Sequence, residues 1–567
     1  MIDLDEVKTD VLVIGAGGAG CRAAIECAKL KCQVLLTSKY PIGKSGATVV
    51  AENFYVAPFC NSEPEDSGDC YVQDMIKGGA GLCETNLAKR LASDGWNRVK
   101  DLEKFGVKVN KDQNGSYAQI NAPGHSHPRG LSPKGGGLGI MRALEKEMKK
   151  YPSISTLEDT IFTKLLVNSG VVTGAIGLNL RKGKPVLVES KGVILATGGY
   201  SSLWSNNDVP CDCTGDGIAM AFDAGAELID LEMLLFYPTV LISPPCVRGV
   251  LVPHGLLIQQ AQAKLLNSQF EEFVPENLPT RDVMNSLIYR EIANGRGSPN
   301  GGIYLDLTRS SRSRDYVKNR LKMFLPEKYK YLLKNGVDIV RQPIEVAPMA
   351  HYSLGGLRIN DNSETSIEGL FAAGEVEGNV HGANRLGGNA LPETQVFGSL
   401  AGKMAASWAK EHDQKGTHLE DVEAELRRLG GLFDQKKGSV KPSHLKAKLQ
   451  DIMWHHVGPA REQQGLEEAV RKIGHIREQE LPQLTVPTMR TFNLQCVDAL
   501  ELSHMVDLSE IIVKSALARK ETRGHHFRLD FPEKRINALH TLVRKEKGEM
   551  RLWTETVGPA DQVKPTI

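Results

Sequence analysis

A glycine-rich turn between a strand and a helix constrains the fold of this chain more than any other feature. Residues 10–14, DVLVI, form a short β-branched run that is typical of a fully buried parallel strand. A helix-forming stretch and a second strand, QVLLTSK at 33–39, follow the turn. The strand–turn–helix order makes this the G-x-G-x-x-G pattern of a dinucleotide-binding unit. The turn consists of Gly15, Ala16, Gly17, Gly18, Ala19 and Gly20.

The glycines of this turn have separate tasks. Gly15 allows the tight turn, Gly17 lets a pyrophosphate approach the backbone, and Gly20 lets the helix and the strand pack closely. The second strand ends in Thr-Ser-Lys, where an NAD-binding unit carries an Asp or Glu for the ribose. No second unit of this kind occurs in the chain, so the sequence predicts one bound dinucleotide, FAD rather than NAD.

Length and composition narrow the class of protein. A chain of 567 residues is too long for one hydrophobic core, so several domains are expected. A net charge of +1 excludes a nucleic-acid binder that relies on bulk positive charge, and the 41% hydrophobic and 24% charged fractions exclude large-scale disorder. No apolar run approaches the roughly 20 residues that a membrane span needs. The start does not resemble a secretory signal and no cysteine lies in a CxxC pair, so we expect a cytoplasmic chain without a metal site.

Changes in residue pattern divide the chain. A β-rich segment at 155–197 ends in ATGGY, where a buried strand again runs into glycine, so we expect one sheet to bind the cofactor from both sides. Residues 227–345 change to mixed strands and helices and indicate an inserted domain, after which GLFAAGE (369–375) returns to the sheet. Helical periodicity dominates from 403, and a polar tail is expected after about 520.

Five separated segments carry a resemblance to a known family. They are VIGAGGAG, ATGGY followed by TGDG (214–217), PMAHYSLGG (348–356), GLFAAGE, and VHGANRLGGNAL (380–391). In this order, and with the C-terminal stretch from 515, they resemble the flavoprotein subunits of succinate dehydrogenase and fumarate reductase. L-aspartate oxidase and the adenylylsulfate reductase flavoprotein belong to the same wider group. The resemblance covers essentially the whole chain.

The resemblance implies an α/β fold, with a FAD-binding Rossmann-like domain, an inserted capping domain and a C-terminal helical domain. The FAD-binding domain is expected in two parts, 1–226 and 348–410, on either side of a capping domain at 227–347. A helical domain at 411–520 and a C-terminal tail at 521–567 complete the chain.

The resemblance also assigns the cofactor site. Glu375 makes physical sense independently, because a carboxylate at a strand end can accept hydrogen bonds from ribitol hydroxyls. Asp216, in TGDG, is either a cofactor contact or the N-cap of a helix. Many relatives attach FAD through the histidine of Ser-His-Thr, whereas residues 44–48 read KSGAT, so we expect non-covalent FAD. The implied FAD contacts are Gly15 to Gly20, Ser38, Lys39, Lys44, Ser45, Gly46, Ala47, Thr197, Gly198, Asp216, Glu375, Ala390 and Leu391.

Three charged residues stand where the family has its chemistry. Hydride transfer next to a carboxylate needs cations that clamp the carboxylate and a proton donor for the other carbon. The resemblance gives Arg281, in LPTRD, the proton transfer, unless it is a surface arginine paired with Asp282. His351 matches a substrate-carboxylate histidine or is a satisfied core histidine, and Arg385 matches the carboxylate clamp or holds the Gly-rich loop.

One end of the expected substrate pocket departs from the family. Tyr237 stands where relatives have a second substrate histidine, and the usual Thr-Glu-Gly and Arg-Gly-Glu-Gly are absent. His254 is a candidate replacement, so both residues are possible substrate contacts. We expect a substrate whose second end differs from an ordinary carboxylate, or one held by the GHSHPR loop with His125, His127 and Arg129. A plain surface loop is the alternative for that segment.

These expectations combine into the flavoprotein subunit of a fumarate-reductase-like oxidoreductase acting on CH–CH bonds. A hydride would pass between N5 of FAD and the activated C=C of a carboxylate, which is fumarate, succinate or another enoate. The chain has no iron–sulfur ligands, so the family implies an iron–sulfur partner subunit, and contact with the inner face of a membrane would come through partners. The alternatives are an adenylylsulfate-reductase-like or amino-acid-oxidising flavoprotein, or an electron-transfer flavoprotein with a disabled pocket.

Overall fold

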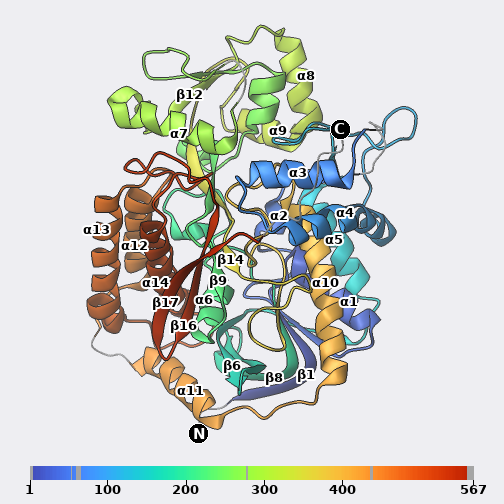
Figure 1. Ribbon diagram of the computed structural model, residues 1–567, viewed down its shortest axis with the longest axis vertical. Coiled ribbons are helices and arrows are strands. Elements are labelled where there is room, and N and C mark those ends of the chain that lie inside the picture. The colour runs from blue at the N-terminus through green and yellow to red at the C-terminus, as the bar shows by residue number, and fades with distance from the viewer. Residues whose placement is uncertain (1–3, 53, 59–64, 276–278, 435–437, 559–567) are drawn as a thin grey trace.

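The computed structural model describes residues 4–52, 54–58, 65–275, 279–434 and 438–558 (Figure 1). Its largest sheet has seven strands: β1 (Asp5–Ile14), β2 (Val34–Thr37), β5 (Ile154–Leu157), β6 (Thr160–Asn168), β7 (Val171–Asn179), β8 (Lys184–Leu195) and β15 (Leu370–Ala372). The order is β5-β2-β1-β8-β7-β6, with β15 also paired to β8. β1 lies parallel to both β2 and β8, and β15 lies parallel to β8. The two strands that end in glycine therefore lie side by side in one sheet, as the sequence predicts.

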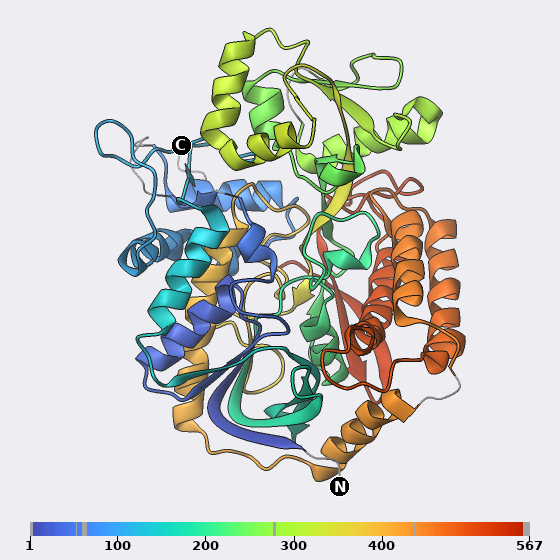
Figure 2. The ribbon, with the colours of Figure 1, turned by 180° about the vertical axis from the view of Figure 1, so that it is seen from behind.

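Small residues let two helices pack closely against each other beside this sheet. These helices are α1 (Gly18–Lys29) and α10 (Ala390–Glu411). A Cβ on Gly398 would lie 2.6 Å from the carbonyl oxygen of Ala19, and a Cβ on Gly402 would lie 2.4 Å from that of Ala23. Glycine at both positions is therefore what permits the approach. The helices α2 (Ala47–Val50), α3 (Gly68–Gly78), α4 (Thr85–Phe105) and α5 (Gly136–Met148) lie on the same side of the molecule as this pair (Figures 1 and 2).

Between β8 and β15 the chain builds a second body, which lies at the top of Figure 1. Its elements are β10 (Leu234–Leu241), β11 (Lys264–Leu266), β12 (Ile303–Asp306), β13 (Ile344–Ser353), α7 (Arg281–Glu291), α8 (Arg314–Phe324) and α9 (Pro326–Lys334). The four strands form an antiparallel sheet in the order β10-β13-β12-β11. β10 and β13 contribute Leu241 and Val346 to a separate core, whereas Phe236 and Ala350 on the same two strands belong to the core of the large sheet. β10 and β13 thus join the two bodies.

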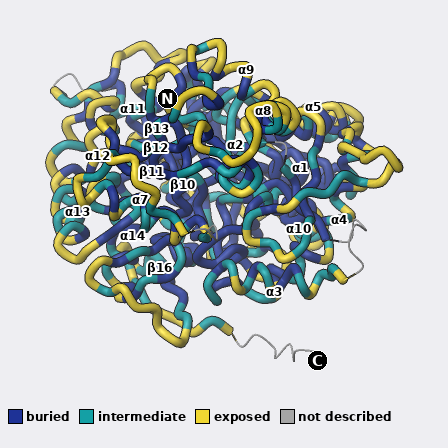
Figure 3. The backbone as a smooth tube through the Cα atoms, turned by 90° about the horizontal axis from the view of Figure 1, so that it is seen from above, coloured by how far each residue is buried: buried dark blue, intermediate teal, exposed yellow. Residues whose placement is uncertain are grey.

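A group of helices flanks the large sheet on its other side. Its members are α6 (Asp216–Asp223), α11 (Leu419–Asp434), α12 (Pro442–Val457), α13 (Gln463–His475) and α14 (Leu494–Ala518). α14 packs against α12, α13 and α6, which explains why most of its residues are buried. Figure 3 shows the exposed positions on the outer helices and the buried ones toward the centre. No helix in the described ranges is both long enough and apolar enough to cross a membrane.

The described part of the chain after 520 is folded, so the prediction of a polar tail is wrong there. Arg519, Arg523 and Arg528 are buried. A hairpin follows and joins a four-stranded sheet of order β14-β9-β16-β17, made of β9 (Leu228–Ile229), β14 (Gly356–Leu357), β16 (Leu539–Glu546) and β17 (Glu549–Thr556). The charged composition is misleading because Arg519 and Arg523 pair with buried acids, and Arg528 bonds Asp530 and the backbone of Ala516. Residues 559–567 of the predicted tail lie outside the described residues.

Candidate active site

A cavity of about 1490 Å³ extends from the Gly-rich turn after β1 to the junction of β10 and β13. The carboxyl ends of β1, β8 and β15 contribute Gly15, Thr197 and Glu375 to its wall. Ligands of open α/β sheets normally bind at this edge. The volume exceeds the roughly 300–1,000 Å³ of an ordinary small-molecule site, which leaves room for a dinucleotide together with a substrate.

Most of the residues that the sequence assigns to the cofactor line this cavity. Gly20 and Lys44 do not. A Cβ on Gly20 would lie 1.8 Å from the carbonyl oxygen of Gly15, so this glycine lets α1 pack against the turn, and Lys44 is exposed. The predicted residues on the wall are Gly15, Ala16, Gly17, Gly18, Ala19, Ser38, Lys39, Ser45, Gly46, Ala47, Thr197, Gly198, Asp216, Glu375, Ala390 and Leu391.

The backbone around the turn fits a dinucleotide such as FAD. A Cβ on Gly17 would meet only Thr48 Oγ1, at 3.7 Å, and Gly46 and Gly198 have no atom within 4 Å of that position. The backbone is therefore open to the cavity at these glycines, as a pyrophosphate needs. The buried hydroxyl of Thr197 has no hydrogen-bond partner within the described residues, so it is free to bond a ligand.

Asp216 belongs to a charged network at the cofactor end of the cavity. It is the first residue of α6, whose N-cap is Gly215, and its side chain does not cap the helix, so the N-cap alternative is wrong. Its carboxylate accepts from Lys39 Nζ at 2.8 Å and lies 3.3 Å from Nδ1 of His504. Burial alone would raise the pKa of Asp216, but Lys39 and His504 hold it well below its usual value. Lys39 also pairs with Glu501 at 2.6 Å. Glu501 and His504 lie on α14 in no recognisable motif, which is why the sequence pattern did not point to them.

His351 and Arg385 meet at the other end of the cavity. His351 Nδ1 lies 2.9 Å from both carboxylate oxygens of Asp208, and its Nε2 lies 3.5 Å from Nη2 of Arg385. The guanidinium of Arg385 lies 4.4 Å from the ring centre of Tyr352, and its Nε has no partner among the described residues. Both side chains line the cavity, so His351 is not a core histidine. Asp208 lies in no motif, and the sequence did not reveal it.

Arg281 lies beside the two residues that depart from the family. Its guanidinium carbon lies 5.0 Å from the ring centre of Tyr237, and its buried Nε and Nη1 atoms have no partner within the described residues. The alternative of a surface arginine is therefore wrong, and Asp282 does not pair with it. Burial lowers the pKa of Arg281 to about 10. The Tyr237 hydroxyl lies 3.1 Å from His254 Nδ1, and its ring lies 5.1 Å from that of His351. Of these two residues, Tyr237 lines the cavity, whereas His254 does not line it and contacts the Tyr237 hydroxyl.

The C-terminal segment adds a histidine to this region. His525 Nε2 lies 3.1 Å from Oδ1 of Asn384, and its Nδ1 lies 3.5 Å from Nδ2 of Asn285 on α7. Burial, reinforced by nearby cations such as Arg281, lowers the pKa of His525 well below its usual value, so the ring is neutral at pH 7. In the sequence, only the two adjacent histidines of GHHF (524–527) could have pointed to His525. In the described ranges, no group of three or more His, Cys, Asp or Glu side chains could hold a metal ion.

Both predictions for the GHSHPR loop, that it holds the substrate and that it is a plain surface loop, are wrong. None of the residues 124–129 lines the cavity, so the loop does not itself clamp the substrate. It is also more than a surface loop, because Arg129 is fully buried and pairs with Asp66 and Asp74 at 2.6 Å each.

Comparisons with known proteins agree with this geometry. A family described as FAD binding domain matches residues 10–391, and one described as fumarate reductase flavoprotein C-term matches residues 446–566. A subunit of the fumarate reductase (CoM/CoB) of Methanothermobacter marburgensis is 38% identical, over 96% of this chain and 98% of that protein. Sdh1 of Mycobacterium smegmatis, solved in complex with UQ1, is 33% identical with a TM-score of 0.88, over 97% of this chain and 94% of that one.

A more distant structure shares the fold. Adenylylsulfate reductase from Archaeoglobus fulgidus has a TM-score of 0.81 at 21% identity, and the match covers 98% of this chain and 96% of that one. Because the first family match covers more than half of the chain and the closer relatives are matched along nearly their whole length, the family is settled. The chain belongs to the succinate dehydrogenase and fumarate reductase flavoprotein family and is an FAD-dependent oxidoreductase.

Proposed function

We propose that this protein transfers a hydride between N5 of FAD and the activated C=C bond of a carboxylate, with fumarate and succinate as the nominal pair. One observation carries the proposal: Arg281 and Arg385 both line the cavity and both keep buried N–H groups without a partner in the described residues. Leaving a buried cation unsatisfied is costly, so such groups are expected where an anionic ligand completes them. A carboxylate offers the matching oxygens.

Each residue of the pocket has a task in this reaction. FAD, when bound at the Gly-rich turn, supplies the hydride donor or acceptor. Arg385 and His351 bind one carboxylate, and Asp208 fixes the imidazole by accepting from Nδ1. Arg281 holds the proton for the second carbon, and its pKa of about 10 makes release easier than from an arginine in water.

Tyr237 and His254 favour a second candidate substrate. Burial lowers the pKa of His254 well below its usual value, so the pair presents a neutral hydroxyl where a cation would suit a second carboxylate. An enoate with a neutral hydrogen-bonding second end, such as a fumarate monoester, matches this arrangement.

We further propose an iron–sulfur subunit as the electron partner. The chain has one dinucleotide unit and no cysteine run for a cluster, and its relatives are named as subunits. Contact with a membrane would be made by such partners. FAD is held without a covalent bond, because residues 44–48 include no histidine. Acid precipitation should therefore release the flavin into the supernatant.

Flavin reoxidation tests the proposed reaction. The FAD-loaded protein is reduced with dithionite under anaerobic conditions, and its absorbance is followed after addition of fumarate, monomethyl fumarate or adenylyl sulfate. We expect rapid reoxidation by fumarate. Reaction with the monoester alone would select the second candidate, and reaction with adenylyl sulfate alone would replace the proposal by sulfur chemistry. Flavin reduction by L-aspartate would favour an oxidase, and silence throughout would favour an electron-transfer protein.

A further inference from the structure

The GHSHPR loop packs against the segment that carries Arg385. His125 Nε2 lies 2.9 Å from the carbonyl oxygen of Gly387, and the Gly387 amide donates to the carbonyl oxygen of Pro123 at 2.9 Å. A Cβ on Gly387 would lie 2.7 Å from Cδ of Pro123, so the two segments are in direct contact. Gly387 lies two residues after Arg385 and lines the cavity.

The protonation of His125 is fixed by its neighbours. Burial lowers the pKa of His125 to about 4, so the ring is neutral at pH 7. A carbonyl oxygen only accepts, so Nε2 carries the hydrogen and donates to Gly387. Nδ1 is then the acceptor, and Nη1 of Arg129 lies 3.3 Å from it. The ring therefore links Arg129 to the backbone of the Arg385 segment in one orientation.

Arg129 is anchored firmly enough to hold that ring. Its side chain is fully buried, and its Nε donates to Asp66 at 2.9 Å. Its Nη1 donates to Asp74 at 2.6 Å, and the same carboxylate accepts from the backbone and hydroxyl of Ser126 at 2.8 Å each. The two acids compensate the buried charge, so this arginine has no need of a ligand.

Tyr71 on α3 provides a second connection to the same segment. Its ring is stacked on His125 with 5.5 Å between the centres, and the Arg129 guanidinium lies 5.1 Å from it. Its hydroxyl donates to Oδ1 of the buried Asn389 at 2.8 Å. The segment 385–389 is thus held at Gly387 and at Asn389 by adjoining side chains.

Pro123, the residue before this loop, also reaches the opposite side of the substrate pocket. Pro123 lines the cavity, and a Cβ on Gly255 would lie 3.2 Å from its Cγ. Gly255 follows His254, whose ring contacts the Tyr237 hydroxyl. Pro123 therefore lies between the backbone that carries Arg385 and the backbone that supports Tyr237.

We propose that residues 122–129, together with Tyr71, form a brace that sets the position of Arg385 against the Tyr237–His254 pair, with His125 as its positioning residue. The inference rests on the proposed function, because it assumes that Arg385 binds a carboxylate. Small shifts of such a group weaken the reaction strongly, since a misplacement of about 1 Å can cost on the order of 100-fold in rate.

Three variants of the FAD-loaded protein test the brace. His125→Leu removes the hydrogen bond to Gly387, His125→Gln keeps an N–H donor, and His444→Ala on the exposed face of α12 is the control. We expect His125→Leu to lower kcat/KM for fumarate about 10- to 100-fold, mainly through KM, with unchanged FAD content and melting temperature. His125→Gln should restore most of the loss, and the control should match the wild type.

Two results would overturn the brace. One is an unchanged KM in His125→Leu, and the other is an equal loss in the Leu and Gln variants. If the wild type reduces no enoate, the proposed function fails, and the brace is decided by crystal structures of the wild type and His125→Leu with FAD bound. A displaced segment 385–389 would support it, and an unmoved Arg385 would overturn it.

Discussion

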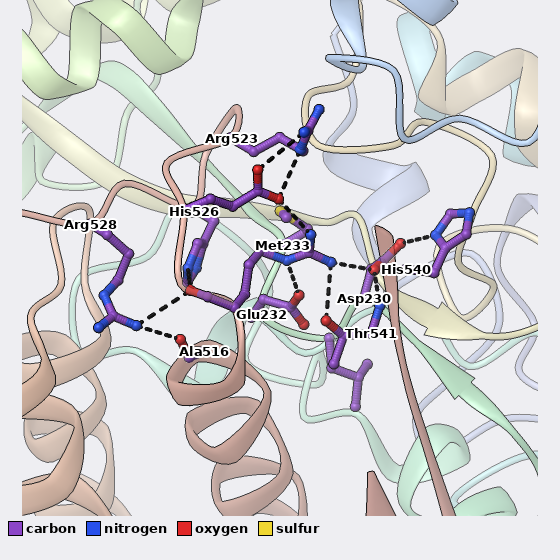
Figure 4. Close-up of polar contacts among 12 residues, drawn as sticks. Asp230, Glu232, Met233, Ala516, Arg523, His526, Arg528, His540 and Thr541 are labelled. Carbon is purple, nitrogen blue, oxygen red and sulfur yellow. Dashed lines mark hydrogen bonds and ion pairs between the residues drawn. The ribbon is translucent and has the colours of Figure 1, made fainter. Parts of the chain in front are cut away.

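Two groups of buried cations differ in one respect, which is whether the protein itself supplies their partners. In the cavity, Arg281 and Arg385 keep N–H groups without a partner among the described residues. In a second group, which we term the C-terminal cluster, Arg519 bonds Asp230 at 2.9 Å and Glu521 at 3.0 Å. Figure 4 shows polar contacts of this cluster, with Asp230, Glu232 and Thr541 among the labelled residues. The C-terminal cluster comprises Asp230, Glu232, Arg519, Glu521, Arg523, His526, Arg528, His540 and Thr541.

We expect this difference to distinguish arginines that stabilise the fold from arginines that bind a ligand. Every nitrogen of the Arg519 guanidinium has an acceptor, and the acceptors come from a loop after β9, from β16 and from the chain after α14. Removing one partner of such a network strands a buried charge. The cavity arginines already lack some hydrogen-bond partners among the described residues, so their removal should affect the reaction more than the stability of the fold.

The largest effect should come from Arg281→Gln. We expect turnover of the reduced flavin with fumarate to fall about 10²- to 10⁴-fold, because a proton donor is lost. The melting temperature should stay the same or rise, since an unsatisfied buried cation is removed. Arg290→Gln, exposed on the same helix, is the matched control. Equal damage to stability and turnover would place Arg281 with the structural arginines.

Arg519→Met should lower stability and leave turnover unchanged, the reverse of Arg281→Gln. We expect the free energy of unfolding to fall by about 3–5 kcal/mol, because Asp230, Glu232 and Glu521 lose their shared partner. Turnover per bound FAD should remain close to the wild type. Urea unfolding measures the first quantity and flavin reoxidation the second, with the exposed Arg427→Met as control. A loss no larger than that of the control would contradict the comparison.

His540 should make the C-terminal cluster sensitive to pH. Burial lowers its pKa, but Asp230 and Glu84 outweigh burial and raise it to about 9 from the usual 6.5. The stabilisation is therefore complete below pH 6.5 and is lost as the pH rises through 9, on the order of 3 kcal/mol in all. In His540→Gln the stability difference from the wild type should be greatest near pH 6 and shrink toward pH 9.5. A difference independent of pH would show that the histidine is neutral.

Tyr237→Phe should give the smallest effect. It removes one hydroxyl and its hydrogen bond to His254, worth about 1 kcal/mol, or roughly fivefold in kcat/KM. The change should be larger for the substrate whose second end contacts this hydroxyl, which steady-state kinetics with fumarate and monomethyl fumarate would reveal. An unchanged kcat/KM for both substrates would mean that Tyr237 contacts neither.

The sequence predicted the parts of the site that depend on local geometry. The Gly-rich turn, the adjacent strands β1 and β8, and the return of the chain at β15 follow from short patterns of glycine and β-branched residues. The resemblance also directed attention to Arg281, His351 and Arg385, which the fold brings to one cavity. Asp208 and Glu501 could not be found in this way, because neither lies in a motif. His525 lies in the C-terminal stretch from 515, but only tertiary packing brings it to Asn384 and Asn285 beside the cavity.

Sequence alone determined the dinucleotide turn and the family. It also determined that Tyr237 and His254 depart from the family pattern, because all of these depend on residue identity and short-range spacing. Tertiary structure decided the role of each charge. The stretch after 520 reads as a basic tail, yet Arg523 and Arg528 in it are buried. Arg519, directly before it, bonds Asp230, an acid about 290 residues earlier in the chain. The GHSHPR loop reads as a surface segment, yet Arg129 is buried with two acids. Whether a cation is paired depends on which distant carboxylates the fold brings within hydrogen-bonding distance, and composition carries no information about that.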